Sequence, residues 1–153
     1  MSDLRLEELT AATIVAANSL GLKPGQEMFI TPVSYAAAAA VTPPESAWQR
    51  VVLQNDKVVG FIHGNFDPEA SAEEFRAALW RINIDAEAQG MGVGTFALNG
   101  LMDEARRRGV ERVTVVYERG DLGPEEFFLH YGFVPVGETE YGEVIGAYDV
   151  TAQ

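Results

Sequence analysis

Three glycines within five residues constrain this chain more than any other feature of its sequence. They lie in the run Gln89-Gly90-Met91-Gly92-Val93-Gly94, between a strand-like segment at 78–84 and a helix-like segment at 95–108. Without side chains, successive backbone N–H groups are accessible, and they point toward one position at the positive end of the helix dipole. The run therefore predicts that a phosphate-bearing ligand binds at this strand–helix junction.

Other glycine motifs fit this run less well. Dinucleotide folds use Gly-x-Gly-x-x-Gly, whereas the spacing here is Gly-x-Gly-x-Gly, and no acidic residue follows about 20 residues later in a second strand. A P-loop needs Gly-Lys-Ser/Thr, which is absent from the run. The structural alternative is a tight turn that needs glycine only for its backbone conformation. Three glycines within five residues are more than such a turn needs.

The composition bounds the class of protein. A length of 153 residues, with 47% apolar residues, predicts one globular domain over residues 1–153. The lack of cysteine excludes disulfides, thiolate metal sites and a cysteine nucleophile. A net charge of −12 argues against nucleic-acid and membrane partners. The negative charge suits a cationic partner, although acidic residues spread along the chain also fit an ordinary surface that keeps a protein in solution. Neither a signal pattern nor a run of about 18 apolar residues occurs, so we expect a cytoplasmic protein.

Periodicity and turn residues predict the elements in the order β-α-α-β-β-β-α-β-α-β-β. The first strand is expected at 4–9, followed by helices at 7–20 and 34–41, with Ile14 and Val15 in the apolar stripe of the first helix. A hairpin turns at 54–57. The expected later elements are strand 77–84, helix 95–108, strand 112–117, helix 125–131 and two strands within 133–150. The earlier strands are joined by hairpins, and the later strands alternate with helices. This order predicts a mixed sheet.

Two segments together resemble the GNAT superfamily of N-acyltransferases. The first, from Ile82 to Gly94, is similar to that family's acetyl-CoA motif: an apolar strand, a short link, then Arg/Gln-x-x-Gly-x-Gly/Ala. The second, Phe127-Phe128-Leu129-His130-Tyr131-Gly132-Phe133, resembles its aromatic pair before Gly-Phe. The resemblance covers Trp48 to about Val150. It implies an α+β fold, with a mixed, mostly antiparallel, twisted sheet of six or seven strands flanked by about four helices.

The resemblance also implies a binding mode for acetyl-CoA as co-substrate, with no metal. Gln89 and the N–H groups from Gly90 to Thr95 would hold the pyrophosphate. The strand ending at Ile84 would pair with the pantetheine arm, and an N–H near Ile84 would polarise the thioester carbonyl. The residues expected to bind the co-substrate are Ile82, Asn83, Ile84, Gln89, Gly90, Met91, Gly92, Val93, Gly94, Thr95 and Phe128.

The proton-transfer groups depart from the family pattern. The usual general acid is a tyrosine at the position of Phe128, and a phenyl ring cannot donate a proton. The proton for the leaving thiolate could come from Tyr131 or from water, or the thiolate could leave unaided, since a thiol has a pKa of about 8.5. Tyr131 also fits a structural role in core packing. His63, on a central strand, is the candidate base, with a structural role as the alternative. Three acids could hold a cationic amine or simply be solvated: Asp85, Asp121 and Glu143.

The predicted function is transfer of an acetyl group from acetyl-CoA to a primary amine of a small molecule by direct attack. Within the superfamily, segments such as Leu79-Trp80-Arg81 are similar to bacterial diamine/polyamine acetyltransferase-like members. Three alternatives stay open: an acyl-CoA-binding module with weak or lost catalysis, an enzyme for protein N-termini or lysines, and a phosphate-ligand protein without CoA chemistry. Many relatives are dimers, so a homodimer is also expected.

Overall fold

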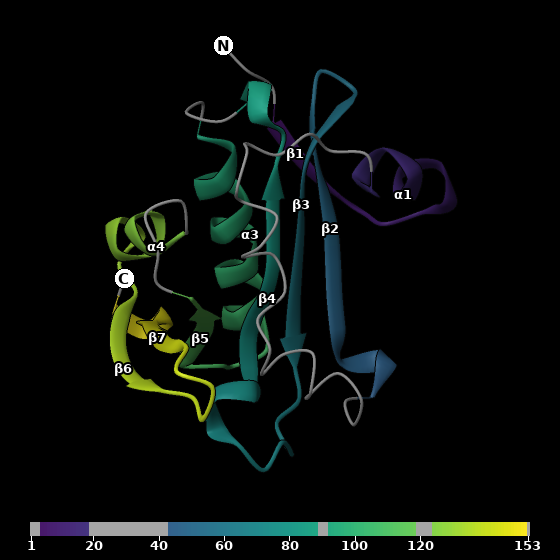
Figure 1. The fold of residues 1–153 in the computed structure, drawn as a ribbon. Coiled ribbons are helices and arrows are strands. Elements are labelled where there is room, and N and C mark those ends of the chain that lie inside the picture. Colours follow the sequence, from purple (N-terminus) through teal and green to yellow (C-terminus); the bar gives the residue numbers. More distant parts are fainter. Residues whose placement is uncertain (1–3, 19–42, 89–91, 119–123, 153) are drawn as a thin grey trace.

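The computed structural model describes residues 4–18, 43–88, 92–118 and 124–152 (Figure 1). Its seven strands form one sheet in the order β1-β2-β3-β4-β5-β7-β6. All neighbours are antiparallel except the parallel pair β4 and β5. This mixed, mostly antiparallel sheet confirms the expected α+β fold. The strands are β1 (Leu4–Glu8), β2 (Ala47–Gln54), β3 (Lys57–Phe66), β4 (Ala77–Ile84), β5 (Arg112–Tyr117), β6 (Val134–Glu138) and β7 (Val144–Asp149). The described α-helices are α1 (Ala11–Asn18), α3 (Val93–Arg107) and α4 (Glu125–Tyr131).

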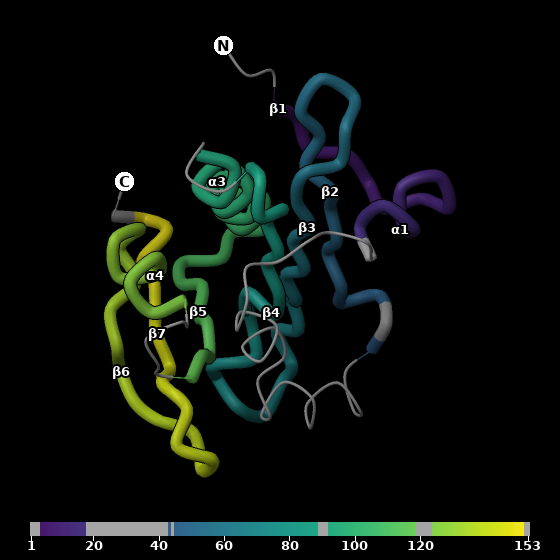
Figure 2. Tube along the Cα trace, turned by 45° about the horizontal axis from the view of Figure 1, so that its top comes forward, coloured from purple at the N-terminus to yellow at the C-terminus, as the bar shows by residue number. Residues whose placement is uncertain are grey.

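Helices cover both faces of the sheet (Figure 2). The amphipathic α3 buries an apolar stripe that includes Leu98 and Leu101 against Ile62 and Leu79 of the sheet. Phe128 of α4 belongs to the same cluster of core residues, so α3 and α4 share one face. On the opposite face, Ala17 of α1 packs with residues of β2 and β3 in a second apolar cluster, Val51, Leu53 and Phe61.

Two local irregularities in the central strands position later parts of the site. The β2–β3 turn holds Asn55 and Asp56 at φ 51° and 72°, the left-handed conformation of a tight hairpin, at the predicted place. In the β3–β4 ladder, His63 pairs with Arg81 and Gly64 pairs with Leu79, so Trp80 is the extra residue of a β-bulge. A bulge turns two consecutive side chains toward one face of a sheet. Trp80 and Arg81 therefore share the face of His63, opposite α3.

Three expectations about the helices need comment. The first helix begins at Ala11 and not at residue 7, because Glu7 and Glu8 continue β1 and pair with β2. Ile14 and Val15 are exposed, and Ala17 is the buried residue of α1. The helix expected at 95–108 begins two residues earlier, at Val93. The second helix, 34–41, lies outside the described residues. None of the helices within the described ranges has the length and apolar character needed to cross a membrane.

Candidate functional site

A gap between β4 and β5 is the central feature of the candidate site. Among the described residues, register pairs join these strands only at Ala78–Thr114 and Leu79–Val115. Beyond that point β4 runs on to Ile84, and β5 runs on to Tyr117, with no further register pair between them. The edge of β4 that faces β5 is thus left without a neighbouring strand, which is the arrangement that accepts an extended ligand as an added strand.

The N-terminus of α3 lies next to the end of β4. Gly92 precedes the helix in a left-handed conformation with φ 81°, and its carbonyl accepts the first helical hydrogen bond from the Phe96 N–H at 2.9 Å. The N–H groups of residues 93–95 precede that bond and have no partner within an α-helix, so they lie at the positive end of the helix dipole. A Cβ built at Gly92 would meet no atom of the described residues within 4 Å, so the described part of the chain leaves the space beside this residue open. The described part of the glycine run therefore fits an anion. Gln89, Gly90 and Met91 lie outside the described residues.

Gly94 marks where three elements of the site converge. A Cβ at this position would lie 3.0 Å from Phe127 Cζ on α4 and 3.8 Å from Ile84 Cγ1 on β4. Glycine at 94 thus lets α3 approach α4 closely. Val93 is buried in the core and Thr95 is exposed, whereas Ile82 and Ile84 are partly buried against the core. Binding by Val93, Ile82 and Ile84 would therefore come from their backbone groups.

Phe128 lies beside the gap and is 3% exposed. Its ring centroid is 5.5 Å from that of Tyr117 at the end of β5, 5.4 Å from Phe127 and 5.6 Å from Phe133. The position at which the family resemblance implies an acidic phenol is thus filled by a phenyl ring within an aromatic cluster. Tyr117 brings a phenol into contact with Phe128. The sequence did not indicate a role for Tyr117, because a tyrosine in a Val-rich strand is typical of core packing.

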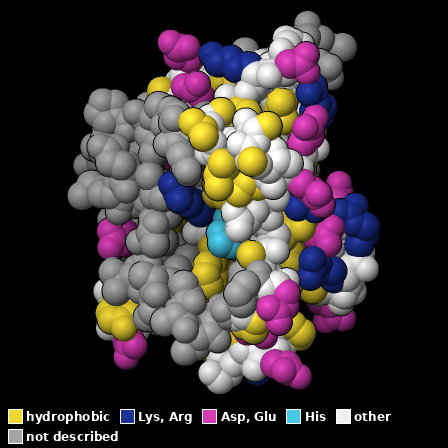
Figure 3. All heavy atoms as spheres, turned by 90° about the vertical axis from the view of Figure 1, so that its right-hand side faces the viewer, with side chains coloured by type: hydrophobic (Ala, Val, Ile, Leu, Met, Phe, Trp, Pro, Cys, Tyr) yellow, Lys and Arg dark blue, Asp and Glu magenta, His cyan; other side chains and the backbone are white. Residues whose placement is uncertain are grey.

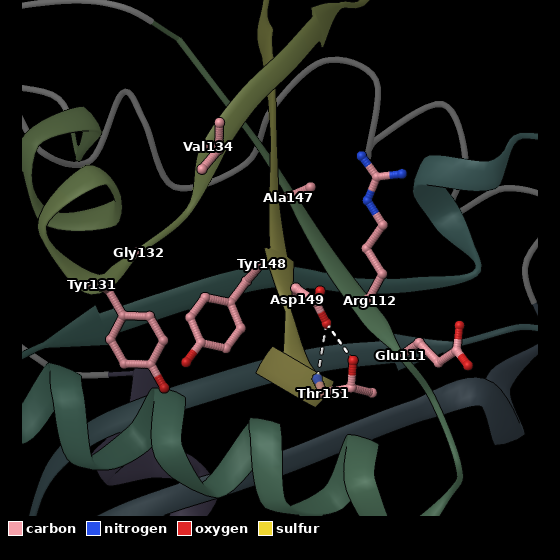
Figure 4. Close-up of a pocket in the computed structure, with 9 residues that line it drawn as sticks. All are labelled: Glu111, Arg112, Tyr131, Gly132, Val134, Ala147, Tyr148, Asp149 and Thr151. Atoms are coloured by element: carbon pink, nitrogen blue, oxygen red, sulfur yellow. Dashed lines mark hydrogen bonds between the residues drawn. The ribbon is translucent and has the colours of Figure 1, made fainter. Parts of the chain in front are cut away.

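Tyr131 lies away from the gap. Its hydroxyl donates to Asn99 Oδ1 of α3 at 2.8 Å, and its ring is 5.1 Å from that of Tyr148. Burial raises the pKa of Tyr131 to about 12, which makes it a weaker acid. Tyr131 and Tyr148 line an open groove of about 610 Å³ at the start of β5, opposite the end where the gap opens (Figure 4). This placement favours the packing alternative for Tyr131.

His63 is partly buried on the face of the sheet opposite α3. Its ring centroid is 5.5 Å from that of Trp80, and it pairs across the strands with Arg81. Its Nε2 atom is buried and has no hydrogen-bond partner within the described part of the chain. Burial lowers the pKa of His63 below its usual 6.5, and the positive charge of Arg81 lowers it further. His63 is therefore neutral at pH 7, the state in which an imidazole can accept a proton.

Arg81 is the residue near His63 that the sequence did not single out. With the Asn83 amide oriented to suit its neighbours, its oxygen accepts from Arg81 Nε at 2.9 Å and Nη2 at 3.1 Å, and its nitrogen donates to the Ile82 carbonyl at 3.0 Å. Arg81 Cζ lies 5.8 Å from the centre of the Phe61 ring. Burial lowers the pKa of Arg81. No carboxylate of the described residues lies within 4.0 Å of this guanidinium. Regular pairing of β4 with β3 places Arg81 opposite His63, and the bulge at Trp80 adds the indole ring to the same face.

Figure 3 shows the molecule from the side of α1 and β2. At the centre of this face, a histidine reaches the surface beside hydrophobic and cationic side chains. The surface seen here is therefore not uniformly acidic, although the whole chain carries a charge of −12.

The acids considered for a cationic amine have local partners where they are described. Asp85 Oδ1 accepts from the Glu87 N–H at 3.3 Å at the start of a short 3-10 turn. Glu143 is 1% exposed, and its Oε1 accepts from the Thr139 hydroxyl at 3.1 Å. Asp121 lies outside the described residues. Within the described ranges, no three His, Asp or Glu side chains are grouped so that they could hold a metal ion.

Comparison with known proteins identifies the class. Residues 20–133 match the acetyltransferase (GNAT) family, and the chain belongs to that family. The chain is 32% identical over 76 residues to the mycothiol acetyltransferase of Beutenbergia cavernae, a match that spans 49% of this chain and 24% of that protein. The chain thus spans about a quarter of that relative's length.

Two solved structures share the fold. The ribosomal-protein-S18-alanine N-acetyltransferase of Escherichia coli superposes with a TM-score of 0.67 at 20% identity, covering 97% of this chain and 94% of that one. The PaiA N-acetyltransferase of Thermoplasma acidophilum, in complex with coenzyme A, superposes with a TM-score of 0.69 at 11% identity, covering 96% and 99%. At these identities the likeness concerns the fold.

Proposed function

We propose that this chain transfers an acetyl group from acetyl-CoA to a primary amine of a small molecule. One observation carries the proposal: the open edge of β4 leads directly to the glycine-flanked N-terminus of α3. An extended arm that ends in a diphosphate needs both features side by side. Membership of the acetyltransferase (GNAT) family supports the same assignment.

The residues divide the binding task by chemistry. The N–H groups of residues 92–95, with Gln89, Gly90 and Met91, hold the diphosphate. The backbone of Ile82, Asn83 and Ile84 pairs with the pantetheine arm. An N–H near Ile84 hydrogen-bonds to the thioester carbonyl, where negative charge develops during attack. Phe128 packs beside the arm and supplies an apolar wall.

The reaction needs one attack and two proton transfers. The neutral amine nitrogen attacks the thioester carbon, the new C–N bond forms, and the C–S bond breaks to release CoA. The proton that the amine loses goes to a base, for which we propose His63, since it is neutral and its Nε2 has no partner within the described part of the chain. The leaving thiolate takes its proton from water, because Phe128 has none to give. Tyr131 stays a less favoured proton donor.

The acceptor is the open part of this proposal. A diamine or polyamine is one candidate, and a protein N-terminus or lysine is another, since the E. coli structural neighbour is named for an alanine of ribosomal protein S18. An acyl-CoA-binding module with weak catalysis is the competing function, and Phe128 is the feature that favours it.

We further propose a cytoplasmic homodimer. Support for a dimer comes from β6, an edge strand whose Val134 and Val136 are 60% and 51% exposed. Exposed apolar edges can pair with a second chain. Light scattering coupled to size exclusion tests this: a monomer mass at all concentrations would contradict it.

Two experiments test the activity. Calorimetric titration with CoA, ATP and NAD should give a response to CoA alone. Incubation with acetyl-CoA and a panel of amines, followed by colorimetric detection of free thiol, should give turnover with some of them. Binding without turnover would favour the binding module, and no binding at millimolar CoA would refute the whole assignment.

A further inference from the structure

Arg81 is the feature of the candidate site that acetyl-CoA binding does not use. Its guanidinium is partly buried beside His63, and its nearest described polar partner is a neutral amide, that of Asn83. We propose that Arg81 binds a carboxylate on the acceptor, so that the acceptor is a small amine of the amino-acid type. This inference rests on the proposed acetyltransferase function and names its substrate class.

The placement of Arg81 is specific. Regular antiparallel pairing of 60–63 with 81–84 places Arg81 opposite His63, and the bulge next to this pair turns Trp80 toward the same face. Asn83 then accepts from two nitrogen atoms of Arg81 and holds the guanidinium in one orientation. A fixed planar guanidinium presents its remaining N–H donors as a fork, which matches a carboxylate.

The charge of Arg81 needs a partner that the described residues do not supply. Burying a cation is costly unless an anion compensates it. Most other described arginines pair with an acid of the chain, for example Arg107 and Arg108 with Glu104 on α3, whereas Arg76 donates to the carbonyl of Ala70. An acceptor carboxylate would supply the missing charge at Arg81.

The location of Arg81 fits a group on the acceptor. Arg81 precedes Ile84 by three residues on β4, the strand that would hold the acyl arm. Three residues span about 10 Å along a strand, and the long arginine side chain can bridge part of that distance. The co-substrate enters beside α3, so the amine approaches from the opposite face, which carries His63, Trp80 and Arg81. Amine and carboxylate would thus lie a few bonds apart, as in an amino acid.

A diamine fits this face poorly. Its second ammonium group would lie near the guanidinium and be repelled by it. Neither of the two described acids considered for a cationic amine, Asp85 and Glu143, lies within 4.0 Å of the Arg81 guanidinium. The local charge at Arg81, and not the total charge of the chain, decides which acceptor binds.

The test compares acceptors that differ only in the carboxylate. Turnover with acetyl-CoA is measured for amino acids, for their C-terminal amides, for the corresponding decarboxylated amines and for diamines. We expect kcat/KM for the best amino acid to exceed that for its amide by about 100-fold, and we expect R81Q to lose about 100-fold with the amino acid and far less with the amide. R81K keeps the charge without the fork and should fall between. Arg112→Gln, at an exposed arginine that pairs with Glu73 at the start of β5, is the matched control.

Calorimetry separates this inference from the proposed function. Binding of CoA should be the same in R81Q and the natural chain, which shows that the variant is folded. A preference for amides or diamines, or an equal loss with both acceptors in R81Q, would overturn the carboxylate assignment while leaving the acetyltransferase intact. If no amine turns over, binding of amino acids to the CoA complex is measured instead, and binding that R81Q does not weaken overturns it. Arg81-dependent turnover confined to peptides with an acidic residue would also overturn the small-molecule class.

Discussion

Alanine at Gly92 separates the backbone role of this residue from its role in binding. Gly92 has φ 81° before α3, and Gly142 has the same φ of 81° in the turn between β6 and β7. A Cβ at either position would meet no atom within 4 Å among the residues that the structure describes. The strain of a left-handed alanine is therefore the main cost in both variants, about 1 kcal/mol of the free energy of unfolding. For a chain of this size, each variant should melt about 2–4 °C lower.

Only Gly92→Ala should weaken the binding of CoA. Its Cβ would project into the open space beside the N–H groups that we assign to the diphosphate. Loss of one charge-assisted hydrogen bond costs about 1.5–3 kcal/mol, which is about 10- to 150-fold in Kd. Isothermal titration of CoA into both variants measures this difference, with Gly142→Ala as the matched control. Equal affinity in the two variants would refute the assignment of the diphosphate to this loop.

Three further predictions concern the proton-transfer groups. Phe128→Tyr should raise kcat in steady-state assays, because it restores a phenol at the position of the family's acid; an unchanged kcat in a folded variant would show that proton delivery to the thiolate is not limiting. The pKa of His63 is lower in the folded protein than in the unfolded chain, so below pH 6.5 the unfolded chain binds a proton at His63 more readily. The free energy of unfolding should therefore fall as the pH drops below 6.5, by at most about 1.4 kcal/mol per pH unit. Urea titrations at pH 7.5 and 5.5 should show a smaller loss in His63→Gln than in the natural chain, and an equal loss in the two proteins would contradict this assignment. Tyr131→Phe should lower the free energy of unfolding by about 1 kcal/mol through the lost bond to Asn99, with kcat unchanged; a large drop in kcat with full stability would instead support Tyr131 as the acid.

The local signals in the sequence were reliable where the structure depends on local geometry. Strand 112–117 and helix 125–131 were predicted with the bounds that the structure has. The turn of the first hairpin also follows from its own residues, Asn55 and Asp56. The boundary at Glu7 was wrong, because pairing with β2 overrode helix propensity there.

The sequence by itself determined the family and the strand–glycine–helix junction to which we assign the diphosphate, since the strand, the glycines and the helix start lie within about a dozen neighbouring residues and form through short-range geometry. The tertiary structure alone decided which side chains meet. Register pairs residues far apart in the chain, so the pairing of β4 with β3 brought Arg81 beside His63, and a bulge added Trp80 to the same face. Packing likewise joined Tyr131 to Asn99, 32 residues away. Contacts of this kind depend on long-range pairing, which no local pattern of residues encodes.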